Sequence, residues 1–352
     1  MRPARDRWIN PALALCICAA AASAFSWLRL PLPWMIGPLA AMALCNLAGA
    51  ELRAPRGGRE IGQIAIGTAL GLYFTPAVAR EVVAYGLLLL LAGVFAILLG
   101  ALCGWLLARM AEADGTTAFF ASVAGGAAEM TILGERFGAR PDRVALAQSL
   151  RIVAVVLVVP VGLTYSGVHG TDLYQPAGLT FDPGWLAVLL GIAAATALAV
   201  NATGMPNAFM FGPLAIVIAL TASGVQFSSL PTALSNTAQA LLGCALGSRF
   251  DRRSLESTPR YVVAVLASVA AAIAVAAGFA LLLAWVSGLP LATLVLATAP
   301  GGLAEMCITA KVLQLGVPLV TAAHVTRVVV LITTTGPTFR LARALRSRFR
   351  RR

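Results

Sequence analysis

The amino-acid sequence predicts an all-α polytopic membrane protein. Of its 352 residues, 59% are hydrophobic and only 11% are charged, and the mean hydropathy is +0.87. A helix needs about 20 apolar residues to cross a hydrocarbon core about 30 Å thick. Runs such as 82–108 and 186–217 supply that length, the second interrupted at 201–207. Neither run shows the alternation of a membrane strand, so both favour helices over a β-barrel.

The chain also contains two similar halves. The stretch "ASVAGGAAEM" at 121–130 matches "ATAPGGLAEM" at 297–306 in six of ten positions, an offset of 297 − 121 = 176 residues. The same offset pairs "QIAIGTALGLYF" at 63–74 with "QALLGCALGSRF" at 239–250, and Gln148 with His324. We therefore predict a duplication. The first membrane repeat is 1–176, and the second, 177–352, ends in a basic cytoplasmic tail.

The loop charges predict how the segments cross the membrane. Six apolar segments occur in each half, near 11–28, 33–49, 61–74, 82–108, 117–133 and 143–166, and near 184–200, 206–222, 235–248, 260–286, 291–310 and 318–336. Twelve plain spans would put several arginine-rich loops outside, against the positive-inside rule. If the fifth segment of each half is broken or re-entrant, nearly every basic loop becomes cytoplasmic. We therefore expect about ten spans in two inverted repeats, with two broken segments and both termini cytoplasmic.

Paired glycines mark the two predicted breaks. Gly125 and Gly126 lie in the first, and Pro300, Gly301 and Gly302 lie in the second. Inside a helix each glycine costs about 1 kcal/mol and a proline about 3 kcal/mol relative to alanine. Unwound backbone at membrane depth must be satisfied by protein or by water. We expect both stretches to line a buried or wet cavity.

An acidic residue follows each glycine pair. Glu129 and Glu305 lie in apolar surroundings, where a carboxylate costs roughly 2.5–3.5 kcal/mol on insertion scales. One interpretation is that the two carboxylates bind a cation or proton, or that the helix starts beside them present N–H groups to an anionic solute. The other is structural: each glutamate caps a broken helix or pairs with Arg151 or Arg327.

Four further polar residues recur at equivalent positions. Arg151 and Arg327 open the last span of each half, where we expect the cytoplasmic boundary. Gln63 and Gln239 each begin a Q-x3-G-x3-G pattern whose glycines allow close helix approach; the glutamines bind either a solute or another helix. The candidate solute- or ion-binding residues are Gly125, Gly126, Glu129, Gly301, Gly302, Glu305, Gln63, Gln239, Arg151 and Arg327.

Other residue types give little sign of a cofactor. All six cysteines lie in apolar segments without CxxC spacing, which favours small core residues. His169 and His324 are the only histidines in the sequence, too few for a familiar metal oxygenase. We predict no metal and no cofactor. The net charge of +12 fits loop topology and anionic lipid, and we expect no direct nucleic-acid binding.

The motifs "LPWMIGPL", "GQIAIGTALGL", "GGAAEM" and "PGGLAEM" resemble those of the bacterial AbrB-type membrane protein family, and the resemblance covers nearly the whole chain. It implies an inner-membrane protein with a duplicated domain, linked to regulation of gene expression. Family members carry names that refer to transcriptional regulation or to ammonia monooxygenase. The two-histidine composition does not support the monooxygenase name, and we expect no enzyme.

The repeated broken segments predict a transporter or permease for a small solute in the bacterial inner membrane, with an indirect effect on gene expression. The alternative is a membrane sensor or regulator that binds a ligand without moving it. Alternating access uses paired half-sites, which favours transport. The expected partners are membrane lipid and an unidentified small solute, and the sequence leaves a homo-oligomer open.

Overall fold

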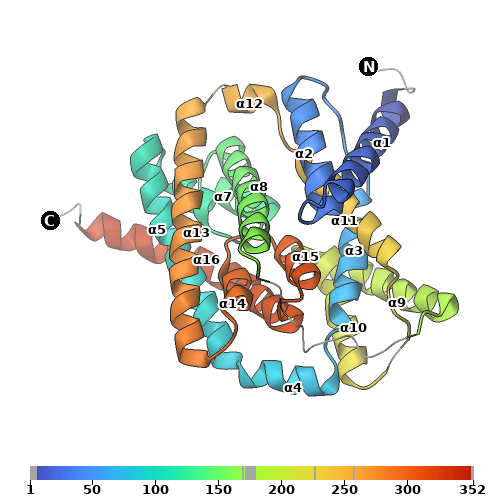
Figure 1. The fold of residues 1–352 in the computed structure, drawn as a ribbon. Helices are drawn as coiled ribbons and strands as arrows, with labels where there is room; N and C mark the ends of the chain where they lie inside the picture. Colours follow the sequence, from blue (N-terminus) through green and yellow to red (C-terminus); the bar gives the residue numbers. More distant parts are fainter. Residues whose placement is uncertain (1–5, 169, 171–179, 226, 257, 350–352) are drawn as a thin grey trace. The chain divides into compact units, whose positions relative to one another are not determined.

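The computed structural model describes residues 6–168, 170, 180–225, 227–256 and 258–349, and every regular element in these ranges is an α-helix (Figure 1). Six helices are long and apolar enough to cross a membrane. They are α1 (Asp6–Trp27), α5 (Gly86–Ala111), α8 (Pro141–Tyr165), α9 (Pro183–Ala202), α13 (Pro259–Ser287) and α16 (Val317–Phe349). The chain is a polytopic helical membrane protein, as predicted. The expected number of about ten crossings stays a prediction.

Both predicted breaks are present. The fifth segment of the first half forms α6 (Gly115–Ser122) and α7 (Ala127–Arg136), and that of the second half forms α14 (Leu291–Thr298) and α15 (Leu303–Leu313). Val123 ends α6 and Ala299 ends α14 in the same extended conformation. Neither short helix pair contains a continuous helix of the length that a plain span needs.

Two helices, α4 and α12, are not predicted by the sequence. α4 (Pro76–Ala84) follows α3 (Gly58–Gly71), and the axes of the two helices differ by 90°. α12 (Arg252–Glu256) is a single exposed turn closed by an ion pair of 2.7 Å between its first and last residues. Both lie at the ends of apolar segments, where polar residues weaken the hydropathy signal.

The chain folds into two compact units, and each draws segments from both halves of the sequence. Unit 1 comprises Met1–Ala84, Val155–Pro259 and Ala304–Leu319. Unit 2 comprises Tyr85–Ala154, Arg260–Leu303 and Val320–Arg352. The repeat boundary near 176 concerns sequence similarity rather than compactness, and it stays a prediction.

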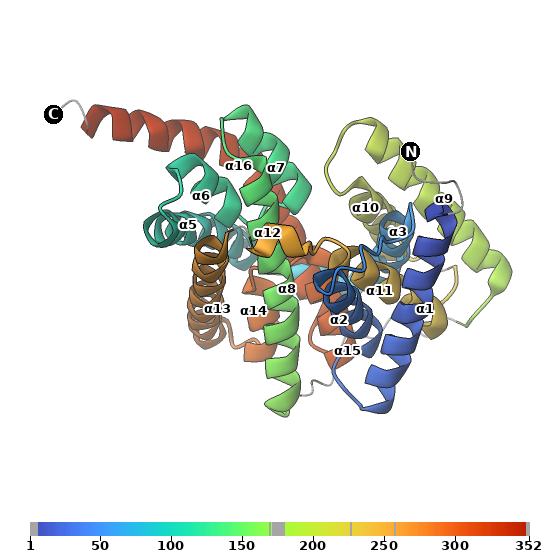
Figure 2. The ribbon, with the colours of Figure 1, turned by 90° about the horizontal axis from the view of Figure 1, so that it is seen from above.

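In unit 1, helices of the first half pack against helices of the second half (Figures 1 and 2). α3 packs against α10 (Ala208–Ala222), and α11 (Thr232–Gly247) packs against α2 (Pro33–Leu47). A Cβ on Gly67 would lie 2.8 Å from the carbonyl oxygen of Met210. Gly243 meets the carbonyl oxygen of Met35 in the same way. The glycines of both Q-x3-G-x3-G patterns therefore allow close packing, as the sequence favours.

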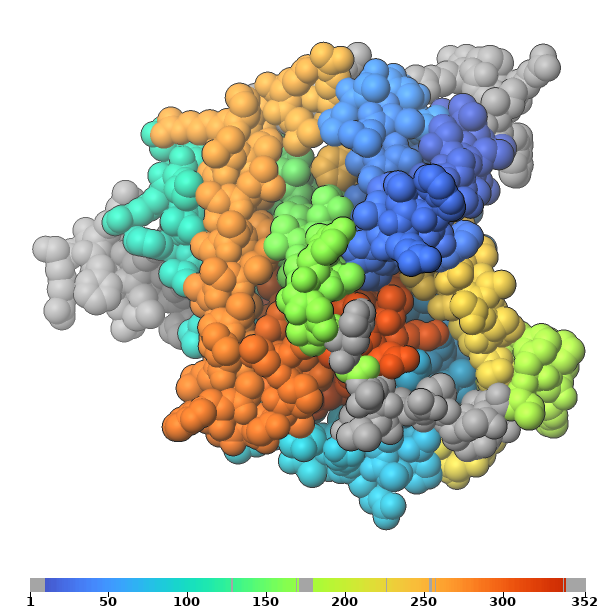
Figure 3. Space-filling model, in the orientation of Figure 1, coloured from blue at the N-terminus to red at the C-terminus, as the bar shows by residue number. Residues whose placement is uncertain are grey.

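In unit 2, α5 and α13 pack along one another. The Cys103 thiol donates to the carbonyl oxygen of Ser268 at 3.7 Å, and the Ser268 hydroxyl donates to that of Cys103 at 3.3 Å. Phe95 and Phe279 stack with ring centroids 3.9 Å apart. The outer side of α13, orange in Figure 3, carries exposed apolar side chains, including Trp285 at 85% exposure. Such a face suits contact with lipid.

Candidate solute site

The two breaks are held by polar side chains from α8 and α16, all within unit 2. Gln148 Nε2 donates to the carbonyl oxygens of Phe120 at 2.8 Å and Val123 at 2.9 Å. His324 Nε2 lies 2.9 Å from the carbonyl oxygen of Leu296, to which it hydrogen-bonds. The four contacting positions obey the offset of 176 residues, since 120 and 148 correspond to 296 and 324. The offset of 176 residues pairs Gln148 with His324, but neither is among the candidate residues predicted from the sequence.

One buried arginine contacts each break, one turn after that polar residue. Arg151 Nη1 donates to the carbonyl oxygen of Val123 at 3.0 Å. Arg327 donates from Nη1 to Ala299 at 2.6 Å and from Nη2 to Gly301 at 2.7 Å. These carbonyls belong to the C-terminal ends of α6 and α14 and to the loops that follow. A positive charge there interacts favourably with the helix dipole and satisfies backbone that a helix would otherwise have bonded.

Both arginines lie deep in candidate membrane spans. Arg151 follows Pro141, the first residue of α8, by ten positions, and Arg327 follows Val317 of α16 by ten. At a rise of 1.5 Å per residue this places each about 15 Å into its helix. Their exposed fractions are 5% and 3%. The carbonyls of the breaks give each guanidinium polar partners inside the protein. The expectation that the two arginines lie at the cytoplasmic boundary stays a prediction.

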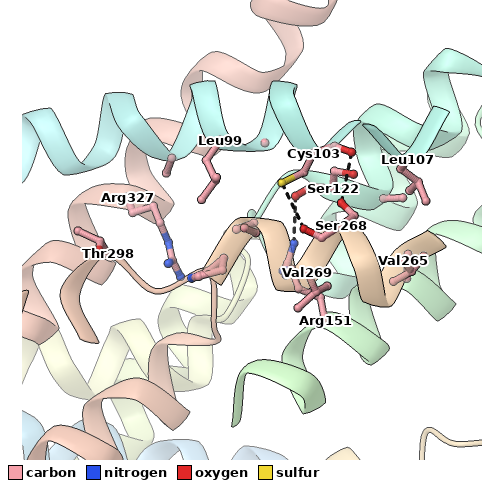
Figure 4. Close-up of a pocket in the computed structure, with 17 residues that line it drawn as sticks. Leu99, Cys103, Leu107, Ser122, Arg151, Val265, Ser268, Val269, Thr298 and Arg327 are labelled. Carbon is pink, nitrogen blue, oxygen red and sulfur yellow. Dashed lines mark hydrogen bonds between the residues drawn. The ribbon is translucent and has the colours of Figure 1, made fainter. Parts of the chain in front are cut away.

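The two arginines line one cavity (Figure 4). Its polar lining residues are Cys103, Ser122, Arg151, Ser268, Thr298 and Arg327, and the others are small or aliphatic. Several lining positions are equivalent across the halves: 96 with 272, 122 with 298, 124 with 300, and 151 with 327. Among the described residues, no aspartate or glutamate lines it. The cavity is therefore basic and built from matching parts of both halves.

The cavity is small. The volume that the centres of water molecules can occupy inside it is about 30 Å³. One water needs roughly 10–15 Å³ on this measure, so about two waters would fit. In this arrangement the site therefore holds only a very small molecule.

The glutamates and glycines of the motifs are not among the residues that line the cavity. Glu129 and Glu305 lie in the first turns of α7 and α15, where a carboxylate favours the helix start. Both are half-buried, and in the described part of the chain neither forms an ion pair. Glu129 belongs to unit 2 and Glu305 to unit 1. The motif glycines form the breaks, adjacent to Ala124 and Pro300 of the lining.

The remaining candidates belong to unit 1. Gln63 and Gln239 are buried in α3 and α11, at 8% and 5% exposure. Within the described ranges neither side chain forms a hydrogen bond. His169 lies outside the described residues. Elsewhere in those ranges, no group of three or more histidine, cysteine, aspartate or glutamate residues is placed to hold a metal ion.

Comparison with known proteins identifies the family of this chain. The family model described as "Transition state regulatory protein AbrB" matches residues 34–343. The chain belongs to the AbrB family. The matched range of this AbrB family member includes both breaks and both arginines.

Two relatives of similar length resemble it. "Uncharacterized protein YhjN" of Bacillus subtilis (strain 168) is 27% identical over 336 residues, covering 88% of this chain and 86% of the relative. "Putative regulator AbrB" of Escherichia coli (strain K12) is 27% identical over 320 residues, covering 89% of this chain and 90% of the relative. Only the second name refers to a role, that of a regulator.

Proposed function

We propose that this AbrB family member is a multi-pass permease of the bacterial inner membrane that moves a small solute through the cavity of unit 2. The observation that carries the proposal is the cavity itself, a small site lined by two arginines between two helix breaks at equivalent sequence positions. Discontinuous helices that meet at a binding site near the middle of the membrane are a recurring arrangement in secondary transporters. On this proposal both termini are cytoplasmic, and the protein is not an enzyme.

The local energetics support a moving part. Each break exposes backbone carbonyls that must be satisfied at membrane depth, and the bonds to them come from α8 in the first half and α16 in the second. A shift of either break would exchange these bonds for bonds to water or to a solute. Such an exchange costs less than opening a continuous apolar helix, because the polar groups are already present.

A regulatory effect then follows from the solute. A change in its cytoplasmic concentration would act on gene expression indirectly, in agreement with the regulator name carried by the Escherichia coli relative. The small size of the cavity favours one alternative, a membrane sensor that binds its ligand there without moving it. The two functions differ in one measurable quantity, the flux of the ligand.

The test is uptake into liposomes that contain the purified protein, with pooled small solutes, in the presence and absence of a pH gradient. We expect saturable uptake by the wild type. If Glu129 and Glu305 couple uptake to protons, the double variant Glu129→Gln/Glu305→Gln loses the dependence on the gradient. Glu135→Gln, at an exposed position near the end of α7, is the matched control. Binding without flux would favour the sensor, and neither binding nor flux would contradict both functions.

A further inference from the structure

We infer that the solute of the unit 2 cavity is a small monovalent anion with planar oxygens, such as a carboxylate or nitrate, and that it binds the guanidinium group of Arg151. This inference rests on the proposed function, because it takes the cavity to be the solute site. It adds the chemical class of the solute and the atoms that recognise it.

The charge of the cavity is the first reason. Arg151 and Arg327 both line it, and arginine stays protonated in proteins. In the described part of the chain, no carboxylate lines the cavity and Arg151 forms no ion pair. Its neutral partners are the carbonyl oxygens of Ser122 and Val123. A buried charge is costly without a counter-ion, and an anion would supply one.

The free edge of Arg151 is the second reason. Its bonds to the break all come from Nη1. Nε is buried and, among the described residues, has no hydrogen-bond partner; Nη2 forms no hydrogen bond there either. The N–H groups of Nε and Nη2 lie in the guanidinium plane, on one edge of the group, and point in the same direction. That pair of parallel donors matches two oxygens of a planar anion.

The volume and the positive charge of the cavity narrow the class of solute further. Room for about two waters admits an anion of a few heavy atoms, and a larger solute would have to extend beyond the cavity. Two guanidinium groups repel a cation. Chloride would meet the charge but not the paired geometry of the donors, so we expect nitrate to bind more tightly than chloride.

If Arg151 had only a structural role, it would not need the free donors of Nε and Nη2. Holding the break requires only the Nη1 donors, and a lysine ammonium in place of the guanidinium can donate to the same carbonyls. Arg151→Lys therefore keeps the charge and removes the parallel pair of donors. The variant separates the two roles, since a structural role predicts little change in anion binding.

The experiment measures nitrate binding to the purified full-length protein in detergent, by calorimetry and by the melting temperature, with gluconate salts holding the ionic strength constant. We expect saturable binding and a melting temperature that rises with nitrate. Arg151→Lys should weaken binding about tenfold or more. Ala272→Val, which narrows the cavity at a lining position, should weaken it while leaving both arginines in place. Arg143→Lys, on the same helix but outside the cavity lining, should leave it unchanged.

The outcomes are separable from the test of transport. Nitrate binding that is equal in the wild type and in both cavity variants would overturn the inference, as would the absence of any nitrate binding. Flux of a neutral or cationic solute, together with no anion binding, would leave the transporter standing and refute the anion site. Anion binding without flux would support the anion site and refute the transporter.

Discussion

At the residue scale, burial and spacing give the same residue type different roles. Arg151 lies deep in α8 and binds carbonyls of a break, whereas Arg260 pairs with Glu112 on the surface at 2.9 Å. The sequence shows both as arginines at the ends of apolar runs. Only the fold reveals that the carbonyl partners of Arg151 lie 28 residues away in the chain, so its environment could not be predicted from neighbouring residues.

Substitution of single glycines tests the close packing of α3 against α10. A methyl group on Gly67 would meet the Met210 carbonyl at 2.8 Å, and overpacking of this kind typically costs about 1–3 kcal/mol. Gly67→Ala should therefore lower the melting temperature of the purified protein. Gly191→Ala, in helix α9 with open space around its Cβ position, should leave it unchanged or raise it. Equal melting temperatures for the two variants would show that α3 and α10 do not pack as described.

At the scale of elements, hydropathy and glycine pairs predicted most of the architecture. Each of the twelve apolar segments contains a helix, and both predicted breaks are present at the glycines. α4 was missed because Arg80 and Glu81 lower its hydropathy. A local signal was available, since Thr75 precedes Pro76 and its hydroxyl oxygen accepts from the Val78 amide at 3.4 Å. Such a Thr-Pro pair often starts a helix.

The first break depends on Gln148, which we expect to be needed for stability. Gln148→Met would leave the carbonyl oxygens of Phe120 and Val123 without this donor, at a cost of about 1–3 kcal/mol for an unsatisfied buried group. Gln239→Met is the matched control, because Gln239 is also buried but forms no hydrogen bond within the described ranges. The melting temperature should fall more for Gln148→Met. A larger fall for Gln239→Met would contradict the role of Gln148.

At the scale of the whole molecule, the central prediction from the sequence is the inverted arrangement of the two halves. Positions 136 and 312 are equivalent under the offset of 176 residues and lie in the last turns of α7 and α15, the helices that follow the two breaks. Both are exposed in the structure. An inverted repeat requires that they face opposite sides of the membrane.

Single cysteines at these positions test the topology. Arg136→Cys and Val312→Cys, each in a chain without its other cysteines, are labelled from outside the cell with an impermeant thiol reagent. We expect labelling of Val312→Cys only. Labelling of both positions after the membrane is made permeable shows that each is accessible. Equal labelling in intact cells would refute the inverted repeat.

The most direct measurement of the central claim is nitrate uptake into proteoliposomes by the wild type, Arg151→Lys and Arg143→Lys. Nitrate stays ionised and crosses lipid poorly, so uptake reports the protein. If the cavity of unit 2 is an anion transport site, uptake saturates in the wild type, persists in Arg143→Lys and is lost in Arg151→Lys. Absent uptake in the wild type, or equal uptake in all three proteins, would contradict it.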